Sequence, residues 1–134
     1  MFKVLVIDAD SNFASALGRA IVQEGHEARI VGDAKYGIVR AKAFDPDLVL
    51  IDTNVPGVRG TELIEELKTL VSGRVVVCAE SDDANTVKAA IAAGASDYVL
   101  KSSGIDAIIT RTCKSDSAGD AGESAEAEAE DDVE

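Results

Sequence analysis

The chain has 134 residues, with 13 Lys and Arg against 25 Asp and Glu, which gives a formal net charge of −12. This length allows one domain with a single core. The acidic balance argues against nucleic-acid binding, because contacts to a phosphate backbone need concentrated Lys and Arg. No apolar run approaches the roughly 20 residues of a membrane span, and two cysteines are too few for a disulfide framework. We therefore expect a soluble, cytoplasmic protein.

Most of the chain alternates apolar strand patterns with amphipathic helical patterns. Apolar runs predict strands at 3–8, 26–31, 48–51, 74–79 and 97–100. Helices are predicted from Asp10 or Ser11 to about Glu24 and at 33–43, 61–70, 85–93 and about 104–113. This alternation predicts an α/β fold, a doubly wound five-stranded parallel sheet with helices on both faces. The flavodoxin-like strand order 2-1-3-4-5 fits best.

Residues 115–134 differ in composition from the rest of the chain. They hold nine of the 25 acids, no Lys or Arg, and a single aliphatic residue larger than Ala, Val133. Such a segment cannot bury enough apolar surface to offset the entropy lost on ordering. We therefore predict a folded domain over residues 1–114 and a disordered acidic tail over residues 115–134.

Asp52 stands where a buried-strand pattern meets a loop pattern. The apolar run 48–51 is continuous, as expected for a strand covered on both faces, and Asn54, Pro56 and Gly57 follow the acid. Ligands of open α/β sheets bind outside the carboxyl ends of the strands. Asp52 is therefore a candidate functional residue, with the alternative that it only caps a turn.

Further chemically useful side chains follow the neighbouring predicted strands. Asp8 ends the first predicted strand and Asp10 follows it, Cys78 lies near the end of the fourth, and Lys101 follows the fifth. In the predicted order, strands one and three are neighbours, so Asp8 and Asp52 would face one crevice. Carboxylates beside a lysine are typical of sites for Mg²⁺ and a phosphoryl group, because Mg²⁺ prefers oxygen ligands and lysine offsets phosphoryl charge.

These blocks resemble the receiver (CheY-like) domain of two-component response regulators. The resemblance covers about residues 2–113 and rests on VLVIDAD, LVLIDTNVPGVRG, VVVCAE and GASDYVLK. It implies that Asp52 accepts a phosphoryl group from a histidine kinase or phosphotransfer protein, a covalent step that carboxylates can perform. It also implies signalling through protein contacts, with no enzyme activity beyond self-phosphorylation and dephosphorylation at Asp52.

The resemblance also assigns roles to the other site residues. Mg²⁺ would be held by Asp8, Asp52 and the backbone carbonyl of Asn54, with Asp8 orienting a metal-bound water. Lys101 would contact the phosphoryl group, and Cys78 would occupy the switch position.

Tyr98 matches the aromatic residue whose rotation reports activation in this family. By resemblance it would lie on a face built by the fourth helix, the fifth strand and the fifth helix. A downstream protein effector would bind there.

Three positions depart from the family pattern. The family places a second acid, a direct metal ligand, where this chain has Ala9. Asp10 could replace that ligand only if the loop bends, because successive side chains of an extended strand point in opposite directions. Cys78 replaces a Thr or Ser hydroxyl and is a weaker hydrogen-bond donor. Ser102 replaces a proline with a cis peptide bond, which predicts a trans bond and a rearranged loop.

Two functional hypotheses follow from this pattern. The first is a receiver that is phosphorylated on Asp52 with Mg²⁺ as cofactor. The second is a pseudo-receiver, a protein-interaction or localisation module that works without phosphorylation, which the three departures favour. A flavodoxin-like cofactor binder is disfavoured, because the loop DADSNF lacks the phosphate cradle that such proteins need.

Overall fold

The computed structural model describes residues 1–114 of the chain. The strands are β1 (Lys3–Ile7), β2 (Glu27–Val31), β3 (Leu48–Ile51), β4 (Arg74–Ala79) and β5 (Asp97–Leu100). The α-helices are α1 (Ser11–Gln23), α2 (Ala34–Phe44), α3 (Gly60–Leu70), α4 (Ala84–Ala93) and α5 (Ile105–Ile109). The predicted acidic tail, residues 115–134, lies outside the described residues. Within the described ones, no helix is long and apolar enough to cross a membrane.

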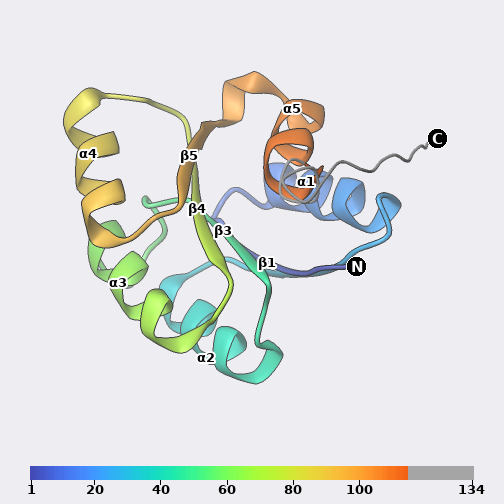
Figure 1. Cartoon of the computed structure of the whole chain (residues 1–134), viewed down its shortest axis with the longest axis horizontal. Coiled ribbons are helices and arrows are strands. Elements are labelled where there is room, and N and C mark those ends of the chain that lie inside the picture. The colour runs from blue at the N-terminus through green and yellow to red at the C-terminus, as the bar shows by residue number, and fades with distance from the viewer. Residues whose placement is uncertain (115–134) are drawn as a thin grey trace.

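The five strands form one parallel sheet in the order β2-β1-β3-β4-β5. Helices α1 and α5 lie on one face of the sheet, and α2, α3 and α4 lie on the other (Figure 1). This arrangement confirms the predicted doubly wound, flavodoxin-like fold. Strands β1 and β3 are neighbours although they are not consecutive in the chain, so the switch point lies between their carboxyl ends.

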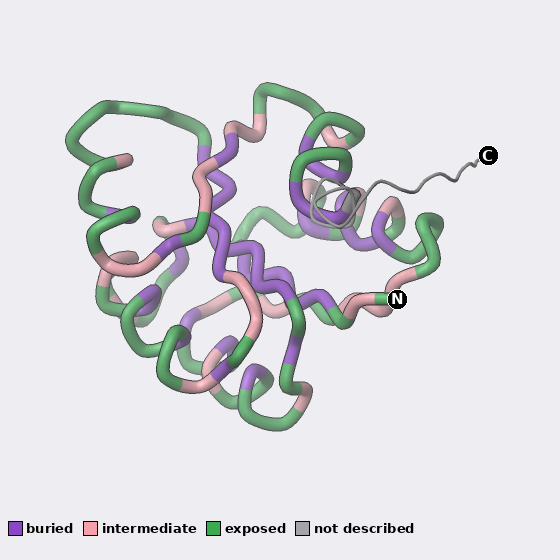
Figure 2. The backbone as a smooth tube through the Cα atoms, viewed as in Figure 1, coloured by how far each residue is buried: buried purple, intermediate pink, exposed green. Residues whose placement is uncertain are grey.

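The core consists of two apolar clusters, one on each face of the sheet. Leu5 and Ile7 belong to the cluster under α2, α3 and α4, whereas Val4 and Val6 belong to the cluster under α1 and α5. This division follows from the two-residue period of a strand. Figure 2 shows the central strands as buried. Cover on both faces explains why these strands are continuous apolar runs rather than alternating ones.

Aspartates and glycines set most helix boundaries. The carboxylates of Asp10, Asp33 and Asp83 accept hydrogen bonds from backbone N–H groups three residues further on, which caps the starts of α1, α2 and α4. Gly25 and Gly94 adopt left-handed conformations, with φ of 92° and 117°, where α1 and α4 end. Apart from the last helix, every element begins and ends within one residue of its predicted bounds.

The predicted helix at about 104–113 is wrong in its details. A 3-10 turn covers Lys101–Ser103, α5 is short, and a π-helical turn follows at Thr110–Lys114. The buried Thr112 hydroxyl donates to the Ile108 carbonyl at 2.7 Å. Such a bond competes with regular α-helical pairing. As expected from Ser102, the peptide bond after Lys101 is trans, and none of the described residues has a cis peptide bond.

Candidate functional site

Asp8 and Asp52 lie side by side at the carboxyl edge of the sheet. Ile7 pairs with Ile51 in the β1–β3 ladder, and each aspartate is the next residue in the chain. The ladder continues one step further, because the Asp52 N–H donates to the Ile7 carbonyl at 2.9 Å. The two acids are therefore neighbours at this edge of the sheet, as the predicted strand order requires.

Lys101 bridges the two carboxylates. Its Nζ lies 2.8 Å from Asp8 Oδ2 and 2.9 Å from Asp52 Oδ2. The side chains of Lys101, Asp8 and Asp52 are only 9%, 3% and 10% exposed, so this contact is shielded from water. Phe13 of α1 lies against the same ammonium, with its ring centroid 4.7 Å from Nζ. We refer to Asp8, Asp52 and Lys101 as the buried triad.

The second oxygen of each carboxylate is held by the backbone. Asp8 Oδ1 accepts from the Asp10 N–H, and Asp52 Oδ1 accepts from the Asn54 N–H, each at 2.9 Å. Both bonds are local turns in which an aspartate binds the backbone two residues ahead. Asp52 therefore does cap a turn, as the alternative reading expected, but its other oxygen faces Lys101.

The charges of the triad affect one another. Burial alone would lower the pKa of the Lys101 ammonium, but its hydrogen bonds to Asp8 and Asp52 outweigh burial and raise that pKa. Burial raises the pKa of Asp8 above its usual value, although the bonds from Lys101 and the Asp10 N–H act in the opposite direction. Lys101 is therefore the protonated cation of the site at neutral pH.

Cys78 is the last residue but one of β4, and its side chain belongs to the cluster under α1 and α5. The charges of Lys101, Asp8 and Asp52 act on its thiol. It is 2% exposed. Burial raises the pKa of its thiol to about 12, with a smaller opposing effect from Lys101. The side chain is therefore a neutral thiol at neutral pH, not a nucleophile, and it can offer only a weak hydrogen bond.

The remaining predicted metal ligands, Asp10 and Asn54, are exposed to solvent, unlike Asp8 and Asp52. Asp10 is exposed and its Oδ1 accepts from the Phe13 N–H at 3.1 Å as the cap of α1. Asn54 is exposed on the loop after β3. Across residues 1–114, no three His, Cys, Asp or Glu side chains group in a way that could hold a metal ion. Because Ala9 offers no side-chain oxygen, the carboxylates at this edge of the sheet are those of Asp8 and Asp52.

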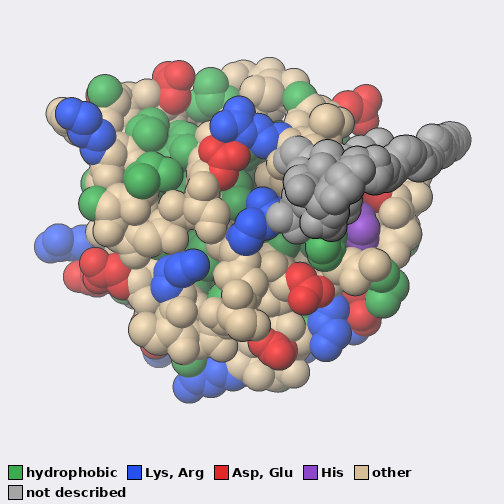
Figure 3. All heavy atoms as spheres, in the orientation of Figure 1, with side chains coloured by type: hydrophobic (Ala, Val, Ile, Leu, Met, Phe, Trp, Pro, Cys, Tyr) green, Lys and Arg blue, Asp and Glu red, His purple; other side chains and the backbone are tan. Residues whose placement is uncertain are grey.

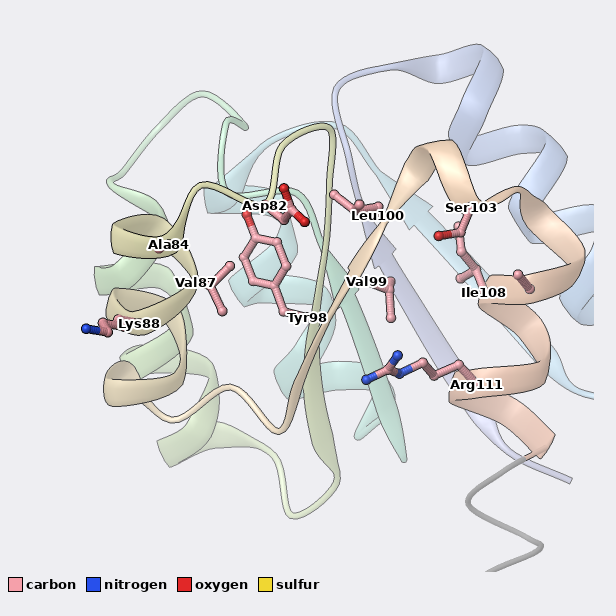
Figure 4. A pocket seen from close by; sticks show the side chains of 11 residues that line it. Asp82, Ala84, Val87, Lys88, Tyr98, Val99, Leu100, Ser103, Ile108 and Arg111 are labelled. Atoms are coloured by element: carbon pink, nitrogen blue, oxygen red, sulfur yellow. The ribbon is translucent and has the colours of Figure 1, made fainter.

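Tyr98 lies on β5 beside α4, as Figure 4 shows. Its hydroxyl donates to the Ser81 carbonyl at 2.6 Å. The ring lines a groove of about 640 Å³ between α4, β5 and α5, together with Val87, Lys88 and Arg111. We refer to this groove and its rim as the α4–β5–α5 face. On the side of the molecule turned to the viewer, hydrophobic, basic and acidic side chains are interspersed (Figure 3).

The same face carries a second charged cluster. Arg111 holds Asp97 with two hydrogen bonds, from Nε to Oδ2 at 2.7 Å and from Nη2 to Oδ1 at 2.9 Å. The two side chains are 59% and 32% exposed. Burial alone would raise the pKa of Asp97, but the hydrogen bonds from Arg111 and the Tyr98 N–H outweigh it and lower that pKa. We refer to Arg111 and Asp97 as the surface pair.

Sequence reasoning missed two features of the site. Phe13 is not among the predicted site residues, and no motif marks it as a neighbour of Lys101. The contact between Lys101 and Asp8 was also not anticipated. The strand order does place both residues at one edge of the sheet, but only side-chain positions show that a single ammonium reaches both carboxylates.

Comparison with known proteins agrees with the fold. Residues 4–112 match the response regulator receiver domain. The chain is 33% identical over 102 residues to the nitrate/nitrite response regulator protein NarL of Escherichia coli K12, covering 73% of this chain and 47% of that protein. The chain thus spans less than half the length of the curated relatives it matches.

Solved structures show the same architecture. A CheY-like receiver domain protein of Methanospirillum hungatei superposes with a TM-score of 0.79 at 22% identity, over 85% of this chain and 91% of that one. The signal receiver domain of the response regulator NarL of Mycobacterium tuberculosis has a TM-score of 0.74 at 26% identity, over 89% and 97%.

The chain therefore belongs to the receiver domains of two-component response regulators. Receiver domains are signalling domains rather than enzymes as a class. They work with histidine kinases and effectors, and they typically bind Mg²⁺ for phosphorylation.

Proposed function

We propose that this chain is a phosphoryl-accepting receiver and that Asp52 is the acceptor. The observation that carries this proposal is the contact between Asp52 and the charged Lys101, 2.9 Å apart. Both side chains are largely shielded from solvent at the switch point of the sheet. An Asp52 oxygen would attack the phosphorus of a phosphohistidine. The bond between phosphorus and the imidazole nitrogen would break, its electron pair staying on that nitrogen, and an acyl phosphate would form on Asp52.

Each neighbour of Asp52 has a part in this chemistry. The Lys101 ammonium would offset the charge of the incoming phosphoryl group, because it already lies at hydrogen-bond distance from the acceptor. The Asn54 N–H fixes the other oxygen of Asp52 and so orients the carboxylate. At the switch position, the Cys78 thiol would give the phosphoryl group only a weak donor.

Mg²⁺ enters this proposal as a weakly held cofactor. Asp8, Asp52 and the Asn54 carbonyl would supply its oxygen ligands, with Asp10 as a further candidate if its loop rearranged. Ala9 adds no side-chain ligand, and Lys101 contacts an oxygen of both carboxylates. We assign no step of the transfer to the metal.

A histidine kinase or phosphotransfer protein would supply the phosphoryl group, and a protein effector would bind the α4–β5–α5 face. Support for that face comes from its mixed lining, since interfaces combine apolar area with a polar rim. The Tyr98 hydroxyl is bonded to the loop that follows β4, three residues beyond Cys78. Movement of that loop on phosphorylation would therefore release or reposition Tyr98.

The test is labelling with acetyl phosphate in the presence of Mg²⁺, followed by intact-mass measurement and peptide mapping. The wild-type chain should gain one phosphoryl group on Asp52. The variant Asp52→Asn should gain none, and Asp97→Asn serves as a matched control that loses an acid outside the pocket and should label normally. Absence of label on the wild type with acetyl phosphate and with histidine kinases would overturn the proposal.

The second candidate is the pseudo-receiver, an interaction or localisation module that works without phosphorylation. It is favoured by the neutral, buried Cys78 and by Ala9 beside Asp8. In that case Asp52→Asn should leave effector binding unchanged, whereas substitutions on the α4–β5–α5 face should weaken it. A phosphoryl-accepting receiver predicts instead that treatment with acetyl phosphate changes effector binding by the wild type but not by Asp52→Asn.

A further inference from the structure

All four oxygens of the two pocket carboxylates already have a donor within the chain. The backbone N–H groups of Asp10 and Asn54 bind the Oδ1 atoms of Asp8 and Asp52. Both Oδ2 atoms face the single ammonium of Lys101, at 2.8 and 2.9 Å. A cation that entered this pocket would therefore compete with Lys101 for both carboxylates.

The charges of the pocket are nearly balanced by this arrangement. Two carboxylates and one ammonium leave a single net negative charge, and the two acids are 3% and 10% exposed. Buried charges persist where they are paired and hydrogen-bonded. Ala9 is exposed next to Asp8 and supplies no third carboxylate. The pocket therefore lacks the extra negative charge that a divalent ion would balance.

Lys101 has a further partner in the ring of Phe13. Its ammonium lies 4.7 Å from the centroid of the Phe13 ring, a cation–π contact that adds attraction where water is excluded. The 3-10 turn Lys101–Ser103 begins at this residue, and Gly104 at its end donates its N–H to the Lys101 carbonyl at 3.1 Å. Backbone and ring together keep the ammonium between the two carboxylates.

We propose that the Lys101 ammonium is the resident cation of this pocket and takes the place of a divalent metal between Asp8 and Asp52. The inference deepens the proposed function, on which it rests for its relevance to signalling, because it says what holds the acceptor carboxylate before a phosphoryl group arrives. The wild-type pocket consequently binds Mg²⁺ weakly. Affinity rises when an acid is added at residue 9 or when the competing ammonium is removed.

The experiment is calorimetric titration of the 134-residue chain with MgCl₂, alongside the Mg²⁺ dependence of its thermal unfolding. Ala9→Asp adds a third carboxylate beside Asp8, and we expect it to bind Mg²⁺ at least about tenfold more tightly than the wild type. Lys101→Met frees both Oδ2 atoms, and its unfolding temperature should rise with Mg²⁺ more than that of the wild type. Ala89→Asp adds the same charge at an exposed position of α4 and should behave like the wild type.

Two results would overturn the inference. One is wild-type Mg²⁺ affinity equal to that of Ala9→Asp, and the other is a Lys101→Met variant that folds but gains no response to Mg²⁺. If Lys101→Met does not fold, the comparison of wild type, Ala9→Asp and Ala89→Asp decides alone. No phosphoryl donor is present, so failure here is distinct from failure of Asp52 to become labelled.

Discussion

The buried triad and the surface pair use the same chemistry in different surroundings. Both join carboxylates to a basic side chain at 2.7–2.9 Å. Triad side chains are at most 10% exposed, whereas Arg111 is 59% exposed and Asp97 32%. Exposed ion pairs contribute little to the free energy of unfolding because water and salt screen their charges. Breaking a buried pair is costly because it leaves a charge without a partner.

This difference separates two tasks in one domain. In the triad, desolvation makes each charge depend on the others, so the arrival of a phosphoryl group at Asp52 would disturb Lys101 and Asp8 together. Each member of the surface pair can replace its partner by water at small cost in free energy, which suits the face proposed to bind an effector. Equal coupling in the two clusters would remove this distinction.

The largest effect is expected from Lys101→Met. Asp8 and Asp52 would be left buried without their cation, so the free energy of unfolding should fall by about 3 kcal/mol. Urea denaturation at neutral pH measures this loss. As a control, the double variant Asp8→Asn with Lys101→Met removes one of the stranded charges and should recover part of the loss. If Lys101→Met lowers the free energy of unfolding by less than about 1 kcal/mol, the triad is no more stabilising than an exposed ion pair, which contradicts the comparison.

A smaller effect is expected from Cys78→Thr. The hydroxyl is a better donor than the thiol, and one charge-assisted hydrogen bond to the phosphoryl group corresponds to about a tenfold faster labelling of Asp52. The rate is measured with acetyl phosphate by intact mass over time. Cys113 is also a buried thiol, but it belongs to the π-helical turn after α5, so Cys113→Thr should label at the wild-type rate. Equal rates for both variants would contradict the role given to residue 78.

The pKa of an acid in each cluster should also be shifted in opposite directions, upward for Asp8 and downward for Asp97. Carbon-detected NMR of the side-chain carboxyls should place the midpoint of Asp8 above 3.8 and that of Asp97 below 3.8. Asp8 therefore contributes stability that is present below pH 3.8 and is lost as the pH rises through its folded pKa. Asp97 contributes stability that is present above pH 3.8 and is lost as the pH falls through its folded pKa. Midpoints in the reverse order would show that burial does not dominate at Asp8.

The smallest effect is expected from Arg111→Met, the surface counterpart of Lys101→Met. It should lower the free energy of unfolding by less than about 1 kcal/mol, because both side chains of the pair reach solvent. Added salt should shrink the difference further. Urea denaturation at low and high salt measures both quantities. A loss as large as that of Lys101→Met would contradict the comparison.

The sequence predicted the fold well because its signals are local. Strand β3 is a bare apolar run, and Asp10, Asp33 and Asp83 cap helices through bonds that span only three residues. The end of the chain was predicted poorly for the opposite reason. Thr112 bonds Ile108 from a buried position, and its carbonyl accepts from Arg74, a residue far away in the sequence.

The candidate site likewise has one part that the sequence predicts and one part that it does not. That Asp8 and Asp52 adjoin follows from the strand order, which the alternation of apolar runs predicts. The bridge made by Lys101 depends on the course of a long side chain and on the Phe13 ring. No pattern in the sequence encodes those positions, so the contact between Lys101 and Asp8 could not be predicted.

The central claim is that Lys101 holds Asp8 and the proposed acceptor Asp52 together as one buried unit. A double-mutant cycle tests it most directly, with Lys101→Met, Asp8→Asn and their combination measured by urea denaturation, beside the cycle of Arg111→Met and Asp97→Asn. The account predicts a coupling energy above about 1.5 kcal/mol for Lys101 with Asp8 and below about 0.5 kcal/mol for the surface pair. Coupling energies of equal size in the two cycles would contradict it.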